Sequence, residues 1–351
     1  MDLKKYGFIP ETDSGDEAGI PARITAVHKE RYELVCEYGL GYARLKTKEY
    51  YNRTEDFPTA GDFVRIDYIP NGDSRIIRTL PRRTFFSRRD PTPGRGEQAV
   101  AANFDYVFIL QSLNHNFNGK RLERYLTLAW QSGAVPVVVL TKADLTEDAS
   151  PYLQTVESIA PGVDVWAVSA RSGFGMDKLE RYVQPGKTIV FLGSSGVGKS
   201  SLVNALAGEE IMEVSEIREE DSRGRHTTTH RQLIMLKNGA MVIDTPGMRE
   251  LGMWDVSVGI HDAFEDVEEY LGRCRFSDCR HKSEPGCAVR AAIERGELAL
   301  ERWESYCKLK GEAKFSDDKG AYRRQKQQRN KMIAKQIRAK KSGDIRLSSH
   351  S

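Results

Sequence analysis

The sequence predicts an α/β domain with a parallel sheet, flanked by a small N-terminal β-barrel and a helical C-terminal module. Four observations lead to this fold class. A glycine-rich loop lies between a buried strand and a helix within residues 187–201. Short β-rich runs broken by turns fill residues 20–80, and three cysteines with a histidine cluster within residues 274–287. Strands that alternate with helices through residues 105–256 imply a parallel sheet covered on both faces.

The composition is that of a soluble globular protein. The chain has 351 residues, 39% hydrophobic and 29% charged, which is enough for two or three domains. No apolar run approaches the length of a membrane helix, and the N-terminus lacks the apolar core of a signal peptide. We therefore expect a cytoplasmic protein without a membrane partner. Five cysteines, an odd number, argue against a disulfide framework.

The N-terminal third contains three segments of different composition. Residues 1–19 are polar and acidic, and we expect a flexible extension there. Five β-rich runs between residues 20 and 80 predict a closed barrel of the OB type, which either binds an oligonucleotide or only packs against its neighbour. Residues 81–104 are rich in Arg, Pro and Gly and predict an inter-domain linker, whose arginines either contact phosphate or are solvated.

Residues 105–256 form the predicted α/β domain. We expect strands at 106–110, 135–140, 164–170 and 188–192, separated by helices at 121–131, 151–159 and 176–183. Asn238-Gly239 between two apolar runs predicts a hairpin. In parallel sheets ligands bind at the carboxyl ends of the strands, and the motifs of this domain all fall at such ends.

The glycine-rich loop matches the pattern G-x-x-x-x-G-K-[ST]. Backbone N–H groups of such a loop surround phosphate oxygens, its lysine reaches the β- and γ-phosphates, and its hydroxyl residue binds Mg²⁺. The helix that follows directs its positive N-terminus at the same phosphates. We predict that nucleotide phosphates are bound by Gly193, Ser194, Ser195, Gly196, Val197, Gly198, Lys199, Ser200 and Ser201.

A second motif at the end of a buried strand predicts that the base is guanine. The Asp144 carboxylate can accept hydrogen bonds from the ring N1–H and the exocyclic amine of guanine, a donor pair that adenine lacks on that edge. Lys142 can lay its alkyl stem along the base. The alternative for Asp144 is a helix-capping residue. The predicted base site comprises Thr141, Lys142, Ala143 and Asp144, with Ser169 and Ala170 from the next loop.

The last nucleotide motif is Asp244-Thr245-Pro246-Gly247. Asp244 ends an apolar run, where it can bind Mg²⁺ directly or through water together with Ser200. The N–H of Gly247 can contact the γ-phosphate. We predict Thr228, from the triplet Thr227–Thr229, as a further Mg²⁺ ligand, with Thr229 as the alternative.

Three residues are the predicted catalytic groups: Lys199, Gly247 and His226. Many GTPases place a water-orienting glutamine directly after the glycine of this motif, but here Met248 occupies that position. His226 is the nearest group that can orient water. The alternative is that His226 packs or contacts a partner. Slow intrinsic hydrolysis is the expectation.

Residues 257–318 form the predicted helical module, and Cys274, Cys279, His281 and Cys287 follow the spacing C-x₄-C-x-H-x₅-C. Three thiolates and one imidazole predict a closed, structural Zn²⁺ site. Residues 319–351 form a basic tail. Its part from 319 to 341 has no acidic residue, and it either contacts RNA or is solvated.

The nucleotide motifs resemble those of the translation-factor-type GTPases, but in a circularly permuted order. With the barrel and the zinc module, this combination is similar to one family, the small ribosomal subunit biogenesis GTPases called RsgA, YjeQ or YloQ. The resemblance spans about residues 20–312 and includes VLTKADL, FLGSSGVGKSSLVN, GRHTTTHRQL, DTPGMRE and CRFSDCRHKSEPGCAVRAAI.

The resemblance implies a GTP hydrolase that binds the small ribosomal subunit and its rRNA late in assembly. It further implies stimulation by the subunit, one zinc ion, and factor release coupled to hydrolysis; we expect a monomer. Thr141 departs from the asparagine of many members and puts base contacts in doubt. A GTPase of the large subunit, and an RNA-binding assembly protein with GTP as a structural ligand, are the competing interpretations.

Overall fold

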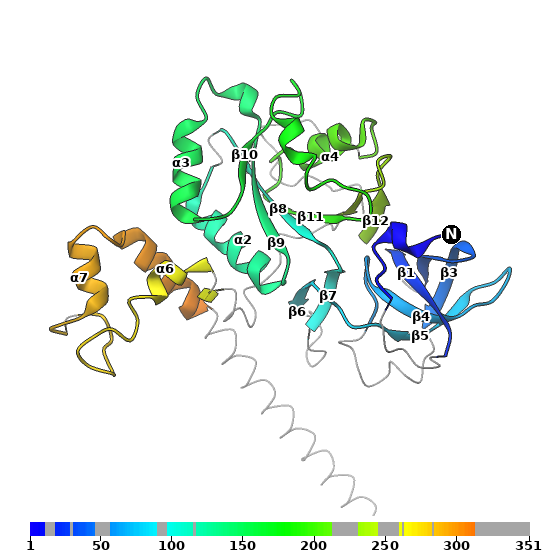
Figure 1. The fold of residues 1–351 in the computed structure, drawn as a ribbon, viewed down its shortest axis with the longest axis horizontal. Helices are drawn as coiled ribbons and strands as arrows, with labels where there is room; N and C mark the ends of the chain where they lie inside the picture. The colour runs from blue at the N-terminus through cyan, green and yellow to red at the C-terminus, as the bar shows by residue number, and fades with distance from the viewer. Residues whose placement is uncertain are drawn as a thin grey trace, which may run out of the picture.

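The structure, a computed structural model, describes residues 1–10, 18–28, 31–45, 57–89, 97–114, 117–212, 231–244, 260–261, 263–282 and 284–312. The α/β domain lies between the barrel and the C-terminal module (Figure 1). The predicted basic tail, His226, Thr228 and Gly247 lie outside the described residues.

Five N-terminal strands close into a barrel, which confirms the predicted OB-like fold. They are β1 (Ile20–Val27), β2 (Tyr32–Cys36), β3 (Gly39–Leu45), β4 (Phe63–Asp67) and β5 (Ser74–Thr79). β1 pairs with both β2 and β4, β3 pairs with β2, and β5 joins β3 to β4. Of these five pairings, only β3–β5 is parallel. Apolar side chains of β1, β2, β4 and β5 fill the interior, among them Ile24, Leu34, Ile66 and Ile76.

The α/β domain contains a six-stranded part of the same sheet, in the order β10-β9-β8-β11-β13-β12. The strands are β8 (Tyr106–Ser112), β9 (Val135–Thr141), β10 (Val165–Ala167), β11 (Thr188–Gly193), β12 (Arg231–Met235) and β13 (Met241–Asp244). The first five in spatial order are parallel, and β12 is antiparallel to β13. The Asn238-Gly239 turn joins β12 to β13 as predicted, with Gly239 at φ 85°.

Helices cover both faces of this sheet, in agreement with the continuous burial of β8, β9 and β11. Val107 and Ile109 of β8 contact the cluster that includes α2 (Gly119–Gln131) and α3 (Ser150–Ile159). Phe108 and Leu110 point to the opposite cluster, which includes α4 (Lys199–Ala207). Short 3₁₀ turns follow β9 and β10 at η3 (Ala143–Leu145) and η4 (Met176–Leu179). Residues 176–183 therefore form a 3₁₀ turn and bends, where the sequence predicted a helix.

The barrel and the α/β domain share one continuous sheet. β1 pairs antiparallel with β12, so Val27 lies opposite Arg231 and Ala26 opposite Gln232. The segment expected to be a linker contains a hairpin of its own, β6 (Phe85–Arg89) and β7 (Glu97–Ala102). Phe86 and Val100 of this hairpin are buried, which explains why a segment rich in Arg, Pro and Gly folds as strands.

The buried side chain of Arg23 connects four segments at this junction. Its guanidinium donates to the carbonyls of Gly61, Tyr6 and Asn103 and to the Thr188 hydroxyl of β11. Burial lowers the pKa of Arg23 to about 9. Tyr6 belongs to η1 (Leu3–Tyr6), whose Leu3 is also buried. Residues 3–6 are thus attached to the folded protein, whereas the sequence predicted a flexible extension.

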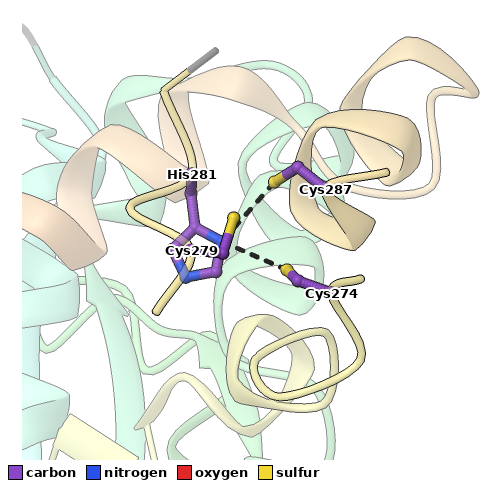
Figure 2. A group of neighbouring side chains, drawn as sticks. All are labelled: Cys274, Cys279, His281 and Cys287. Carbon is purple, nitrogen blue, oxygen red and sulfur yellow. Dashed lines mark hydrogen bonds between the residues drawn. The ribbon is translucent and has the colours of Figure 1, made fainter. Parts of the chain in front are cut away.

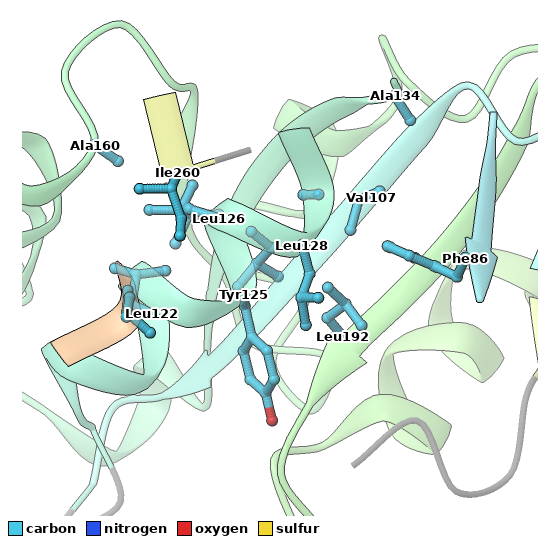
Figure 3. Packing of buried hydrophobic residues seen from close by; sticks show 14 of the residues in the cluster. Phe86, Val107, Leu122, Tyr125, Leu126, Leu128, Ala134, Ala160, Leu192 and Ile260 are labelled. Carbon is cyan, nitrogen blue, oxygen red and sulfur yellow. The ribbon is translucent and has the colours of Figure 1, made fainter. Parts of the chain in front are cut away.

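The C-terminal module packs on α2. Its helices are α6 (Glu265–Glu268), α7 (Ala288–Glu294) and a helical stretch at residues 300–312. Ile260 and Phe264 of the module belong to the same buried cluster as Leu122 and Leu126 of α2. Figure 3 shows Ile260 beside Leu126. The module therefore shares its core with one face of the α/β domain.

Candidate functional site

The glycine-rich loop connects β11 to α4 as predicted. Gly196 and Gly198 have positive φ angles of 71° and 97°, which side-chain-bearing residues rarely adopt. Gly193 lies so close to β8 that a Cβ would stand 3.1 Å from the Cβ of Leu110. α4 begins at Lys199, directly after this loop, so the N–H groups of its first turn face the loop. A curved backbone of this kind presents N–H groups to an anion.

Two charged side chains converge beside the loop. Lys199 Nζ lies 2.5 Å from Asp244 Oδ1, at the carboxyl end of β13. Asp244 is 3% exposed, so its carboxylate is held away from solvent. Lys199 was predicted to contact phosphate and Asp244 to bind Mg²⁺. Their side chains therefore lie next to each other. Ser200 is the next residue of α4.

The loop after β9 is held against the glycine-rich loop by Thr141. Its hydroxyl donates to the carbonyl of Val197 at 2.5 Å, and Thr141 is 4% exposed. The sequence put base contacts in doubt here because threonine replaces asparagine. The hydroxyl instead connects the two loops that would hold base and phosphates, a role that no sequence pattern indicated.

Asp144 is oriented by the loop that follows β10. The Ser169 hydroxyl donates to Asp144 Oδ1 at 2.6 Å, and the Ala143 N–H donates to the carbonyl of Val168. Lys142 has a φ of 60°, a left-handed conformation that is uncommon for a lysine. Thr141, Lys142, Ala143, Asp144, Ser169 and Ala170 therefore gather at the carboxyl ends of adjacent strands. This arrangement brings together every residue predicted for the base site.

A separate cluster in the C-terminal module has the geometry of a metal centre. The ligand atoms of Cys274, Cys279, His281 and Cys287 all lie within 4.8 Å of one another. His281 Nδ1 lies 3.4 Å from Cys274 Sγ and 3.5 Å from Cys287 Sγ (Figure 2). A tetrahedron with Zn–S of about 2.3 Å and Zn–N of about 2.0–2.1 Å has an S···N edge of about 3.5 Å. These four residues therefore can hold a metal ion.

The backbone around the cluster fixes its thiols. Gly286 has a φ of 75°, and a Cβ there would meet Arg275 Cβ at 2.9 Å, so the turn before Cys287 requires glycine. Desolvation raises the pKa of the Cys279 thiol to about 11. Desolvation opposes ionisation of Cys274 too, but the N–H of Ala288 and the neighbouring thiols together lower its pKa. Thiolates this close repel one another unless a cation lies between them.

In the described part of the chain, no helix combines the length and apolar character needed to cross a membrane.

Comparison with known proteins agrees with this arrangement. A family model described as RsgA GTPase matches residues 79–254. A small ribosomal subunit biogenesis GTPase RsgA 2 from Listeria monocytogenes is 46% identical over 346 residues, which cover 96% of this chain and 97% of that protein. An RsgA from Methanosarcina acetivorans is 42% identical and covers 86% of this chain and 81% of its own.

Two solved structures share the fold. The crystal structure of YjeQ from Thermotoga maritima matches with a TM-score of 0.62 at 27% identity, covering 83% of this chain and 96% of that one. The structure of YloQ, described as a circularly permuted GTPase, matches with a TM-score of 0.58 at 25% identity over 84% and 95% of the two chains. On its sequence, its fold and the order of its nucleotide motifs, this chain belongs to the RsgA family of circularly permuted GTPases.

Proposed function

We propose that this GTPase acts in late maturation of the small ribosomal subunit, binding rRNA through its barrel and its zinc module. The observation that carries the proposal is the 46% identity, over 96% of the chain, to a relative named a small ribosomal subunit biogenesis GTPase. Hydrolysis is stimulated by the subunit and coupled to release of the factor. The protein acts as a cytoplasmic monomer.

The geometry of the nucleotide site supports separate roles for the residues that bind the base and those that bind the phosphates. Asp144 accepts hydrogen bonds from guanine, and Ser169 keeps its carboxylate in place through the 2.6 Å hydrogen bond. The loop from Gly193 to Ser201 surrounds the phosphates. Lys199 turns from Asp244 to the phosphates when they bind, which leaves the carboxylate available to a cation.

The hydroxyl of Ser200 and the carboxylate of Asp244 would hold Mg²⁺ together with Thr228. Hard oxygen donors of this kind suit Mg²⁺, which neutralises charge on the β- and γ-phosphate oxygens when bound. Gly247 would contact the γ-phosphate, and His226 would orient the attacking water where Met248 cannot. These assignments for Thr228, Gly247 and His226 rest on sequence position, because all three lie outside the described residues.

The metal in the C-terminal cluster is proposed to be one structural Zn²⁺. Three cysteines and one histidine leave no open coordination position in a tetrahedral site, so the ion stabilises the loop and takes no part in hydrolysis. Exposed Phe276 and Arg275 lie in the same loop, where a cation and an aromatic ring can contact RNA.

The barrel surface offers a second RNA contact. The rings of Tyr38 and Tyr68 stack at 4.4 Å between centroids, and Tyr38 is 64% exposed. Arg31 lies over the ring of Tyr42, and the neighbouring Leu40 is also exposed. Exposed aromatic rings interleaved with arginine are suited to stack on unpaired bases. This surface supports an RNA-binding barrel over one that only packs against its neighbour.

The test is GTP hydrolysis by the purified protein, alone and with isolated small or large ribosomal subunits, with ATP as the control nucleotide. We expect slow turnover alone and strong stimulation by small subunits only. Stimulation by large subunits instead would assign the protein to the other subunit. Stimulation by neither would favour an RNA-binding protein for which GTP is a structural ligand.

A further inference from the structure

Arg231, the first residue of β12, contacts two neighbouring parts of the molecule, the barrel and the β6–β7 hairpin. Its backbone lies opposite Val27 of the barrel strand β1. Its guanidinium donates to the carbonyl of Ala99 at 3.1 Å and reaches the Gln98 side-chain oxygen at 3.5 Å, both on the hairpin strand β7. The Arg231 side chain therefore holds the start of β12 to the β6–β7 hairpin, at the point where the backbone of β12 pairs with the barrel.

The surroundings of the Arg231 guanidinium disfavour its positive charge. Burial, together with the nearby charge of Arg88, lowers the pKa of Arg231 to about 10. Its hydrogen-bond partners in the described part of the chain are neutral oxygens, not a carboxylate. Burying a charge without a counter-charge costs free energy. The two hydrogen bonds to β7 offset part of this cost and fix the Arg231 side chain at the start of β12.

The start of β12 also lies next to Asp244, the predicted Mg²⁺ ligand. Gln232, the residue after Arg231, is paired with Ala26 of β1 on one side and with Asp244 of β13 on the other. Neighbouring strands are about 4.8 Å apart, so about 10 Å of sheet separates the barrel from Asp244. Asp244 in turn contacts Lys199. A displacement of β1 or β7 can therefore be transmitted to the phosphate site through the hydrogen bonds that connect these strands to β12 and β13.

We propose that Arg231 is a positioning residue for GTP hydrolysis, which holds the start of β12 so that RNA bound at the barrel or the hairpin sets the geometry around Asp244. In the sequence, one residue, His230, separates Arg231 from the triplet Thr227–Thr229, which contains the predicted Mg²⁺ ligand Thr228. This role rests on the proposed function, because Arg231 would couple RNA binding by the barrel or the hairpin to the position of Asp244.

The experiment compares Arg231→Ala and Arg231→Lys with the unaltered full-length protein. We expect Arg231→Ala to lower the subunit-stimulated kcat by about ten- to a hundredfold, the size of effect that small misplacements of reacting groups produce. The KM for GTP, the Kd for GDP and the affinity for small subunits should each stay within about twofold, since base and phosphate loops are untouched. Arg231→Lys retains one donor and should give an intermediate kcat.

The matched control is Arg88→Ala. Arg88 lies on the same hairpin and donates to the same Gln98 oxygen, but it belongs to β6 and not to the GTPase strand β12. Its kcat should stay near that of the unaltered protein. A stimulated kcat of Arg231→Ala within twofold of the unaltered value would overturn the role of Arg231 and leave the proposed function intact.

Two further outcomes separate the inference from the proposed function. If small subunits fail to stimulate the unaltered protein, the proposed function is wrong. The intrinsic kcat of Arg231→Ala then tests the positioning role by itself. A fall in intrinsic kcat with unchanged GDP affinity supports positioning, and an unchanged intrinsic kcat excludes it. If Arg231→Ala loses GDP binding through misfolding, the kcat and KM of Arg231→Lys are decisive: a lower kcat at unchanged KM supports the role, and unaltered kinetics overturn it.

Discussion

Arg302 of the C-terminal module forms a buried ion pair with Glu123 of α2, with 3.2 Å between Nη1 and Oε1. The same guanidinium binds Asp266 at 2.9 Å and the carbonyl of Ala263. It also lies over the ring of Phe264, 4.2 Å from the centroid. A single arginine therefore connects the metal-binding module to a helix of the GTPase domain.

Replacing Arg302 by Ala should destabilise the protein strongly. Removal of one partner from a buried pair leaves the other charge uncompensated, which costs about 3–5 kcal/mol. Equilibrium unfolding in denaturant would show a lower midpoint, or a separate early transition of the C-terminal module. The control is Arg295→Ala, which removes an exposed pair with Glu297 and should leave the unfolding curve nearly unchanged. Equal curves for both variants would contradict the structural role of Arg302.

Replacing Thr141 by Val should weaken guanine nucleotide binding. The substitution keeps the shape of the side chain but leaves the buried Val197 carbonyl without its donor, at a cost of about 1–3 kcal/mol. If the same free energy is lost from GDP binding because the two loops are less well ordered, the Kd for GDP rises about 5- to 150-fold. Fluorescence titration with a labelled GDP measures it. Thr146→Val, in an exposed position after the same loop, is the control and should bind GDP normally.

Removing the metal ligands should abolish zinc binding without abolishing hydrolysis. We expect the purified protein to contain about one zinc ion per chain, and Cys279→Ser to contain almost none, because a closed site needs all four ligands. Intrinsic GTP turnover should persist, since the cluster belongs to another module than Lys199 and Asp244. Cys307→Ser, outside the cluster, should retain its zinc. Retention of zinc by Cys279→Ser would exclude the assigned ligand set.

Replacing Arg23 by Ala should loosen the junction between the barrel and the GTPase domain. The Gly61, Tyr6 and Asn103 carbonyls and the Thr188 hydroxyl would lose their shared donor. Hydrogen exchange followed by mass spectrometry should then show faster exchange in residues 1–10 and at the start of β11. Arg65→Ala, which removes a more exposed arginine of the same barrel, provides the comparison. Unchanged protection of residues 1–10 would show that Arg23 does not hold this segment.

The sequence was sufficient wherever chemistry fixes the spacing of residues. Phosphate binding requires the glycine, lysine and serine of the loop at set positions, and Lys199 and Asp244 indeed meet at 2.5 Å. Metal coordination likewise constrained the four ligands that the structure brings together. The barrel was predictable because five short β-rich runs, broken by turns, lie in one segment of about sixty residues. The roles of His226, Thr228 and Gly247 stay predictions.

Contacts between segments distant in the chain could not be predicted. Nothing in the local pattern of β1 shows that its end pairs with β12, about two hundred residues away. Arg23 looks like an ordinary polar residue of a strand, since its partners come from four separate segments. The β6–β7 hairpin was mistaken for a linker because its arginines and prolines outweighed Phe86 and Val100 in the composition.

The pairing of β1 with β12 also protects the molecule against self-association. Without β1, β12 would be the outermost strand of the GTPase sheet and would offer unpaired N–H and C=O groups to another chain. β10, at the opposite end, is only three residues long and offers little to such a neighbour. Deletion of the barrel would therefore expose the edge of β12, to which a strand of another molecule could add. A GTPase domain produced alone should tend to aggregate even where its nucleotide site is intact.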